Sequence, residues 1–353
     1  MHSQPGGQIR IKLLSKFKPG HDGEGWLRLF PKGEPLWGNC RFIFDRDERD
    51  YDWLVVYDEL PSSSGERHTL WEEQLACQPE HTLLITSEPS TIKTYGSSYL
   101  RQFRWVLSSQ EAWALRYHSG QLFEQPALTW FYSTRSPRGD YDNLVAHPPL
   151  EKTRLISTVC SSKQQKHTLH HLRFAFTMAL KQRMPELEIY GHGMQPLDEK
   201  ADALDSYRYH LAIENYAGQH HWTEKLADAF LGACLPFYFG CPNVADYFPE
   251  DSYIPIDIRD YEGSFAIIER AIANKLYEKR LPAILESRRL VLEKYGPIAT
   301  IARIVNAKNT AARAGDGSTV IRSRNLLKRN PAFGARYLLE KLYVRARHKI
   351  EGQ

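Results

Sequence analysis

The chain has few cysteines, no long apolar run and no recognisable leader. Its 353 residues include five cysteines, none in a Cys-x-x-Cys spacing, so neither a disulfide framework nor a zinc ribbon is expected. No stretch approaches the roughly 20 apolar residues of a membrane-spanning helix. The N-terminus lacks the basic segment and apolar run of a secretory signal. We therefore expect a cytoplasmic protein whose cysteines are buried free thiols.

A strong net charge is also absent, although the charge is unevenly distributed. The chain has 46 Lys and Arg against 42 Asp and Glu, a net +4, which is too mild to predict a nucleic-acid partner. Residues 301–353 hold twelve basic and three acidic side chains, a net +9, so residues 1–300 carry a net −5. With 42% hydrophobic and 25% charged residues, the composition is that of a globular protein, and the length predicts two domains.

Short apolar runs separated by Gly, Pro and Ser clusters occupy the first half. We interpret them as strands alternating with less regular helices. The runs are 9–14, 26–30, 40–44, 53–57, 83–86 and 104–107. A stretch rich in Ser, Pro and Gly at about 133–150 then predicts a linker between a domain at 1–150 and a domain at 151–300.

The second half alternates strands and helices more regularly. The predicted strands are 153–160, 188–190, 207–213 and 235–239, with helices from 169 and at 223–233. A strand, a helix and a second strand within 207–239 form a βαβ unit, which implies a parallel sheet with right-handed crossovers. We therefore predict an α/β fold.

The loop at 214–222 is where this sheet should bind a ligand, because open α/β sheets bind ligands at the carboxyl ends of their strands. Thr223 is a candidate N-cap for the next helix, and Lys225 stands in its first turn. A lysine there is unfavourable for the helix itself and so indicates an anionic ligand such as a phosphate. The alternative is a surface lysine paired with Glu224.

Three segments around this loop carry a resemblance to a known family. They are Tyr207-Arg208-Tyr209-His210-Leu211-Ala212-Ile213-Glu214-Asn215, Trp222-Thr223-Glu224-Lys225-Leu226 and Leu235-Pro236-Phe237-Tyr238-Phe239-Gly240. Together they resemble the donor-binding block of the family 10 glycosyltransferases, the α-1,3/4-fucosyltransferases. In the first half, 39–44 and 52–58 are similar to the family's acceptor-domain strands, and Thr86-Ser87-Glu88-Pro89-Ser90 resembles its glutamate-centred motif.

The resemblance implies a GT-B fold, with two Rossmann-like domains facing across a cleft, and an inverting transfer of fucose from GDP-fucose. Such a reaction needs a base beside the acceptor hydroxyl and positive charge beside the departing diphosphate. The matching positions make Glu88 the candidate base and Arg173 and Lys225 the candidate phosphate ligands. Glu224 would contact the ribose, and Glu214 and Asn215 resemble positions near the nucleotide.

Each of these assignments has a structural alternative. Glu88 could be an ordinary loop carboxylate, Arg173 a solvated arginine on a helix face, and Glu214 with Asn215 a pair of loop-capping groups. The sequence also departs from the family where a tyrosine and a branched aliphatic residue are usual, because His221 and Trp222 stand there. This leaves the stacking on the donor, and the identity of the donor, open, with His221 and Thr223 among the candidate donor-binding residues.

Possible metal ligands do not form a recognised motif. His167 and His171 share an i, i+4 spacing without a third ligand nearby. The Asp-x-Asp triplets, at 45–47, 50–52 and 140–142, are easily produced by chance in an acidic body. Since Arg and Lys can neutralise a diphosphate, we predict no obligatory metal or other cofactor.

The basic segment 301–353 is predicted to be a helical tail, with a basic amphipathic helix from Pro331. Such a helix is attracted to anionic lipid. We expect the protein to lie at the inner membrane face and to act on a surface glycan that is lipid-linked or lipopolysaccharide-like. The alternative is a tail that packs on the body or solubilises it.

Two other interpretations of the whole chain stay open. One is the same fold with a different nucleotide-sugar donor. The other is a non-catalytic protein that binds a glycan, a nucleotide or, through its tail, nucleic acid; the acidic body argues against nucleic acid.

Overall fold

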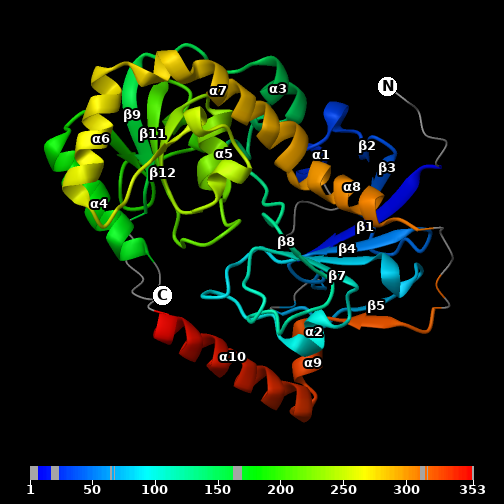
Figure 1. Cartoon of the computed structure of the whole chain (residues 1–353). Helices are drawn as coiled ribbons and strands as arrows, with labels where there is room; N and C mark the ends of the chain where they lie inside the picture. The colour runs from blue at the N-terminus through cyan, green and yellow to red at the C-terminus, as the bar shows by residue number, and fades with distance from the viewer. Residues whose placement is uncertain are drawn as a thin grey trace. The chain divides into compact units, whose positions relative to one another are not determined.

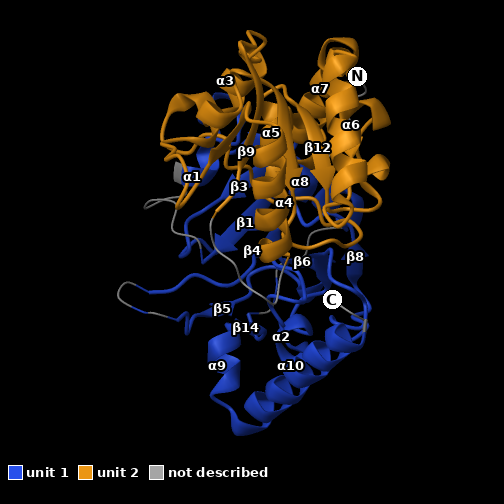
Figure 2. Ribbon diagram, turned by 90° about the vertical axis from the view of Figure 1, so that its left-hand side faces the viewer, with its two compact units in different colours: residues 1–127, 298–353 blue, residues 128–297 orange. Residues whose placement is uncertain are grey.

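The computed structural model describes residues 7–16, 24–63, 66, 68–161, 169–310, 315 and 317–351, and the chain divides into two compact units (Figures 1 and 2). Unit 1 comprises Met1–Ala127 and Ile298–Gln353, and unit 2 comprises Leu128–Pro297. Each unit is built around a sheet made largely of parallel strands. The predicted α/β fold is thus confirmed.

Unit 1 contains a seven-stranded sheet in the order β2-β3-β1-β4-β6-β7-β8, parallel except where β2 meets β3. The strands are β1 (Ile9–Ser15), β2 (Leu36–Trp37), β3 (Cys40–Ile43), β4 (Trp53–Tyr57), β6 (Thr82–Ile85), β7 (Trp105–Ser108) and β8 (Gln121–Phe123). Its helices are α1 (Glu24–Leu27), α2 (Ser97–Leu100), α9 (Arg324–Lys328), α10 (Pro331–Glu351) and most of α8 (Pro297–Lys308). All five residues of β4 are buried, as expected for a central parallel strand.

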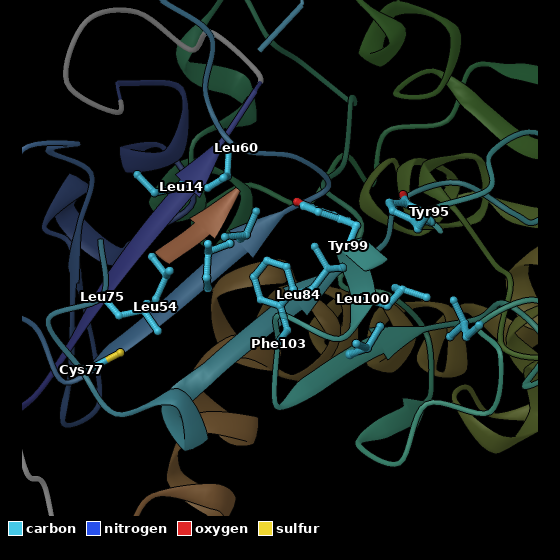
Figure 3. Close-up of a cluster of buried hydrophobic side chains, with 14 of the residues drawn as sticks. Leu14, Leu54, Leu60, Leu75, Cys77, Leu84, Tyr95, Tyr99, Leu100 and Phe103 are labelled. Atoms are coloured by element: carbon cyan, nitrogen blue, oxygen red, sulfur yellow. The ribbon is translucent and has the colours of Figure 1, made fainter. Parts of the chain in front are cut away.

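Part of the core of unit 1 joins strands, loops and the C-terminal segment (Figure 3). Leu54 and Leu84 come from the central strands, and Tyr99, Leu100 and Phe103 come from α2 and the turn after it. The strand β14 (Val320–Arg322) pairs antiparallel with β5 (Glu72–Gln74) and adds the fully buried Ile321 to this cluster. The segment 320–322 is therefore part of the unit 1 core.

Unit 2 contains a five-stranded parallel sheet in the order β10-β9-β11-β12-β13. The strands are β9 (Arg154–Val159), β10 (Leu187–Tyr190), β11 (Tyr207–Ile213), β12 (Leu235–Phe239) and β13 (Ile254–Pro255). Its helices are α3 (Tyr141–Ala146), α4 (His170–Arg183), α5 (Glu224–Leu231), α6 (Tyr261–Ala273) and α7 (Leu276–Leu290). The predicted βαβ unit of 207–239 is confirmed as β11, α5 and β12.

The structure differs from the prediction in three places. The run at 26–30 is not a strand: α1 and a turn cover it, because its buried residues Trp26, Leu29 and Phe30 follow helical spacing. The stretch 133–150, expected to be a linker, lies wholly within unit 2, where Ser133 and Ser136 donate hydrogen bonds to Glu199. Finally, 301–353 is helical from Pro331 as predicted, but the segment belongs to unit 1.

All five cysteines are buried free thiols, as predicted. Within the described part of the chain, no helix is both long enough and apolar enough to span a bilayer.

Candidate functional site

A polar cluster lies at the carboxyl ends of β9 and β11 in unit 2. We call it the donor-side cluster. Its members are Arg173, Glu214, Asn215, Thr223, Glu224 and Lys225. The loop 214–223 joins the end of β11 to the start of α5, so the predicted binding loop and helix start lie where the sequence placed them.

Glu214 holds this loop closed. Its buried carboxylate accepts hydrogen bonds from the Thr223 N–H at 2.8 Å and the Thr223 hydroxyl at 2.6 Å. Gly240, at the end of β12, leaves room for Glu214, since a Cβ there would lie 2.4 Å from the Glu214 Cγ. Burial raises the pKa of Glu214. These contacts are those of a loop-capping group, and its predicted place near the nucleotide stays a prediction.

Thr223 is the N-cap of α5, because its side chain accepts a hydrogen bond from the backbone N–H of Lys225 at 3.3 Å. The Lys225 Nζ lies 2.9 Å from Glu224 Oε1 and 3.5 Å from Glu214 Oε2. Burial alone would lower the pKa of Lys225, but the charges of Glu224 and Glu214 raise it by more. The net shift of the pKa is therefore upward. A fixed cation therefore stands in the first turn of a helix, where the free N–H groups also favour an anion.

Glu224 is the predicted ribose ligand. Burial alone would raise the pKa of Glu224, but the charges of Lys225 and Lys200 lower it overall. The sequence did not predict that Lys200 lies beside Glu224. Its Nζ lies 3.9 Å from Glu224 Oε1 and 3.0 Å from Asp228 Oδ2, but it comes from a 3-10 turn before β11 with no motif to mark it.

Arg173, in the first turns of α4, bridges two strand ends. Its guanidinium donates a 3.0 Å hydrogen bond to Asn215 Oδ1 and a second hydrogen bond to the carbonyl of Val159, the last residue of β9. The residue is 9% exposed, so the interpretation as a solvated helix-face arginine is wrong. The structure brings Arg173 and Asn215 into direct contact, and their contact with a ligand stays a prediction.

The two residues that depart from the family have different surroundings. Trp222 is 2% exposed and packs against the rings of Phe248, Tyr247 and Tyr295 at centroid distances of 5.0 to 5.8 Å, so it fills the core. His221 lies edge-on to Tyr216, with ring centroids 5.2 Å apart. Burial and the charge of Lys225 lower the pKa of His221 to about 4. His221 is therefore a neutral, buried ring beside the cationic lysine.

The candidate base Glu88 belongs to unit 1. It follows β6 on a loop whose backbone is held by Gln110, because the Gln110 side chain donates hydrogen bonds to the Glu88 carbonyl at 2.7 Å and the Lys93 carbonyl at 3.0 Å. The Glu88 residue is exposed. An exposed carboxylate on a fixed backbone can accept a proton from a bound hydroxyl.

Beneath this loop lies a buried ion pair that sequence analysis missed. Asp58, the residue after β4, is fully buried and accepts hydrogen bonds from Ser87 Oγ at 2.9 Å, Lys93 Nζ at 2.6 Å and Tyr95 OH at 2.5 Å. Burial would raise the pKa of Asp58, but Lys93 and the other donors lower it overall. Its position directly after a buried strand was the available signal.

Potential metal ligands are dispersed. No group of three or more His, Cys, Asp or Glu side chains is gathered in the part of the chain that the structure describes, and His167 lies outside it. Asp50 and Asp52, from one of the Asp-x-Asp triplets, both pair with Arg10.

The sequence of unit 2 matches a known family. Residues 149–282 match the family described as glycosyltransferase family 10 (fucosyltransferase), C-terminal part. The matched segment contains the whole donor-side cluster. The family that the sequence resembles is thus confirmed over these residues.

Individual fucosyltransferases also match parts of the chain. It is 30% identical over 89 residues, 23% of this chain and 19% of the relative, to an α-(1,3)-fucosyltransferase of Helicobacter pylori. It is 28% identical over 169 residues, 44% of either chain, to a 4-galactosyl-N-acetylglucosaminide 3-α-L-fucosyltransferase of Gorilla gorilla gorilla. The chain therefore spans less than half the length of these curated relatives.

Solved structures of glycosyltransferases are similar over most of the chain. A DNA-modifying β-glucosyltransferase matches with a TM-score of 0.50 and 8% identity, covering 86% of this chain and 100% of that one. An α1,3-fucosyltransferase with GDP-fucose matches with a TM-score of 0.46 and 16% identity, covering 83% of this chain and 93% of that one. At 8% identity, the likeness to the β-glucosyltransferase concerns the fold alone. This fold is of the GT-B glycosyltransferase type.

Proposed function

We propose that this protein, whose residues 149–282 form a family 10 glycosyltransferase domain, transfers L-fucose from GDP-fucose to a GlcNAc or Glc hydroxyl of a surface glycan. The observation that carries the proposal is the donor-side cluster. Lys225 stands in the first turn of α5 and Arg173 joins the ends of β9 and β11, so two cations lie where a parallel sheet presents a phosphate site.

The proposed reaction inverts the anomeric centre in one displacement. The acceptor oxygen forms a bond to the anomeric carbon of fucose as the bond from that carbon to the GDP oxygen breaks. Glu88 takes the acceptor proton, and Arg173 and Lys225 stabilise the charge that develops on the leaving diphosphate. Glu224 contacts the ribose, and Asn215 and His221 line the nucleotide site.

No divalent metal is needed in this proposal, since the guanidinium and the ammonium supply the positive charge. Treatment with EDTA should leave the transfer rate unchanged. Loss of turnover that manganese or magnesium restores would contradict this part of the proposal.

A panel of sugar nucleotides tests the donor. The melting temperature of the protein should rise with GDP-fucose, because a ligand that binds the folded state stabilises it. A Lys225→Ala variant should show a smaller rise. If another sugar nucleotide raises the melting temperature and GDP-fucose does not, the donor is different. If no sugar nucleotide raises the melting temperature, the result favours the interpretation as a non-catalytic protein.

The outward face of α10 supports a peripheral membrane location, at the inner face where lipid-linked acceptors would lie. Leu338, Leu339, Leu342 and Ile350 are exposed on this helix, which also carries the exposed cations Arg345 and Lys349. Apolar side chains flanked by cations suit an anionic lipid surface, with about 1 kcal/mol per cation near the surface.

Flotation with vesicles tests this location. The full chain should float with vesicles containing phosphatidylglycerol and stay behind with pure phosphatidylcholine. The double variant Leu339→Glu, Leu342→Glu should lose flotation. The matched control Val145→Glu, Leu150→Glu changes two exposed aliphatic residues of unit 2 and should float as the wild type does. Equal flotation of both double variants would contradict the proposed location.

A further inference from the structure

The helix α10 packs against the rest of unit 1 through a largely polar face, which is unusual for an amphipathic helix with exposed leucines. Its inward side chains include Glu340 at 7%, His348 at 5% and Val344 at 2% exposure. Val344 packs with Trp113 and Ala114, and α10 lies beside α2 and α9 (Figure 1). The polar inward face of α10 contacts residues 90–97, the stretch of chain that follows Glu88.

Glu340 holds the far end of that stretch. Its Oε2 accepts a 2.9 Å hydrogen bond from the backbone N–H of Ser97, and its Oε1 accepts one from the Ser97 hydroxyl. One turn before it on the helix, Tyr337 donates a 3.3 Å hydrogen bond to the carbonyl of Thr94. Gly96, with φ of +86°, brings the backbone so close to this ring that a Cβ would lie 2.9 Å from Tyr337 Cδ2.

His348 holds the near end. Its Nε2 lies 2.8 Å from the hydroxyl of Ser90, which is two residues after Glu88. That hydroxyl donates its proton to Glu111 Oε2 at 2.6 Å. Because the hydroxyl has one proton, Nε2 of His348 must be the donor toward Ser90. The hydrogen bonds from His348 to Ser90 and from Ser90 to Glu111 therefore fix the backbone beside Glu88.

We propose that α10 is a brace for the loop that carries the candidate base, with Glu340 and His348 as positioning residues. The inference rests on the proposed role of Glu88. Within the loop between Ser87 and Ser97, the Ser87 and Tyr95 hydroxyls donate hydrogen bonds to the buried Asp58. The Gln110 side chain donates another to the backbone carbonyl of Glu88. The helix α10 supplies further fixed points at Ser90 and Ser97, so a helix near the end of the chain helps to set the position of a carboxylate about 250 residues earlier in the sequence.

Substitutions at His348 test the brace. His348→Leu removes the donor, and His348→Gln keeps an N–H donor at about the place of Nε2. We expect His348→Leu to lower kcat about tenfold with the KM for GDP-fucose unchanged, because a misplaced catalytic group affects the chemical step. His348→Gln should restore most of kcat. The control Ala346→Gln changes an exposed residue of the same helix and should behave as the wild type.

A double-mutant cycle separates this role from general stabilisation. Ser90→Ala should lower kcat at least as much as His348→Leu does, because it also removes the hydrogen bond to Glu111. The double variant should lose little more than Ser90→Ala alone, since both changes remove the interaction between His348 and Ser90. Fully additive losses would overturn the proposal. A loss that His348→Gln does not restore would overturn it as well.

Hydrogen exchange gives a measurement that does not need activity. In His348→Leu and in Glu340→Gln, the amides of 88–97 should exchange faster, while those of β11 and β12 in unit 2 should be unchanged. If the wild type transfers no sugar, the proposed function fails, but this exchange pattern still tests the brace. Wild-type exchange at 88–97 in both variants would contradict it, and so would faster exchange throughout the chain.

Discussion

The polar groups of the two units are assembled in different ways. In unit 2 the donor-side cluster takes five of its six members from the short stretch 214–225, and its charges are partly or fully buried against one another. In unit 1 the exposed Glu88 stands on a loop held by Asp58, Gln110, Glu340 and His348, which are scattered over the whole chain. A cluster such as the proposed phosphate site can be encoded by a short stretch of sequence, at one strand end and one helix start, whereas the position of the candidate base depends on tertiary structure.

The largest effect is expected from Glu88→Gln, which removes the proposed base and so should lower the transfer rate by about 10²- to 10⁴-fold. The affinity for GDP should not change, because the donor-side cluster belongs to the other unit. Transfer kinetics and GDP titration calorimetry measure the two quantities. Glu80→Gln, an exposed carboxylate before β6, is the control. A wild-type transfer rate in Glu88→Gln would show that Glu88 is not the base.

Asp58→Asn tests how strongly the unit 1 loop depends on its buried ion pair. We expect the free energy of unfolding to fall by about 3 kcal/mol, because Lys93 would be left buried opposite a neutral group. Asp50→Asn breaks a surface pair with Arg10 and should cost less than about 1 kcal/mol. Denaturant titration measures both. Equal small losses would show that the loop does not rest on Asp58.

Lys225→Ala should weaken GDP binding about ten- to a hundredfold, since hydrogen bonds to charged groups contribute roughly 1.5–3 kcal/mol. The transfer rate should fall with it, unlike the pattern expected for Glu88→Gln. The control Lys279→Ala removes an exposed lysine of α7 in the same unit. Unchanged GDP affinity in Lys225→Ala would mean that Lys225 only pairs with Glu214 and Glu224 and does not bind the diphosphate.

The smallest effect is a pH dependence of stability from His221. Burial lowers its pKa to about 4 in the folded state, while the unfolded chain binds a proton near the ordinary value of about 6.5. Between these values the unfolded state holds more protons, so the free energy of unfolding falls as the pH falls.

From pH 7 to pH 5 we expect a loss of about 1–2 kcal/mol from this residue. His210, whose pKa burial lowers to about 3, should add a loss of the same sign. His221→Phe should reduce the pH dependence, and the exposed His192→Phe should not. Identical profiles for the wild type and His221→Phe would show that the folded protein does not hold this ring neutral.

The sequence predicted those features whose signal is local. The strands β9, β11 and β12 are apolar runs, and α5 begins at a residue that caps it, so the position of Thr223 and Lys225 followed directly. The segment 26–30 was misassigned because an apolar run of five residues fits a strand or a helical turn equally well. The support of Glu88 by His348 could not be predicted, since no local pattern records a contact between residues 258 positions apart.

Transfer from GDP-fucose, compared with GDP-mannose and UDP-glucose, to a GlcNAc-terminated acceptor measures directly which sugar this protein transfers. We expect transfer from GDP-fucose alone, with a product whose fucose has the anomeric configuration opposite to that in the donor. Transfer from another sugar nucleotide in place of GDP-fucose, or a product of retained configuration, would contradict it.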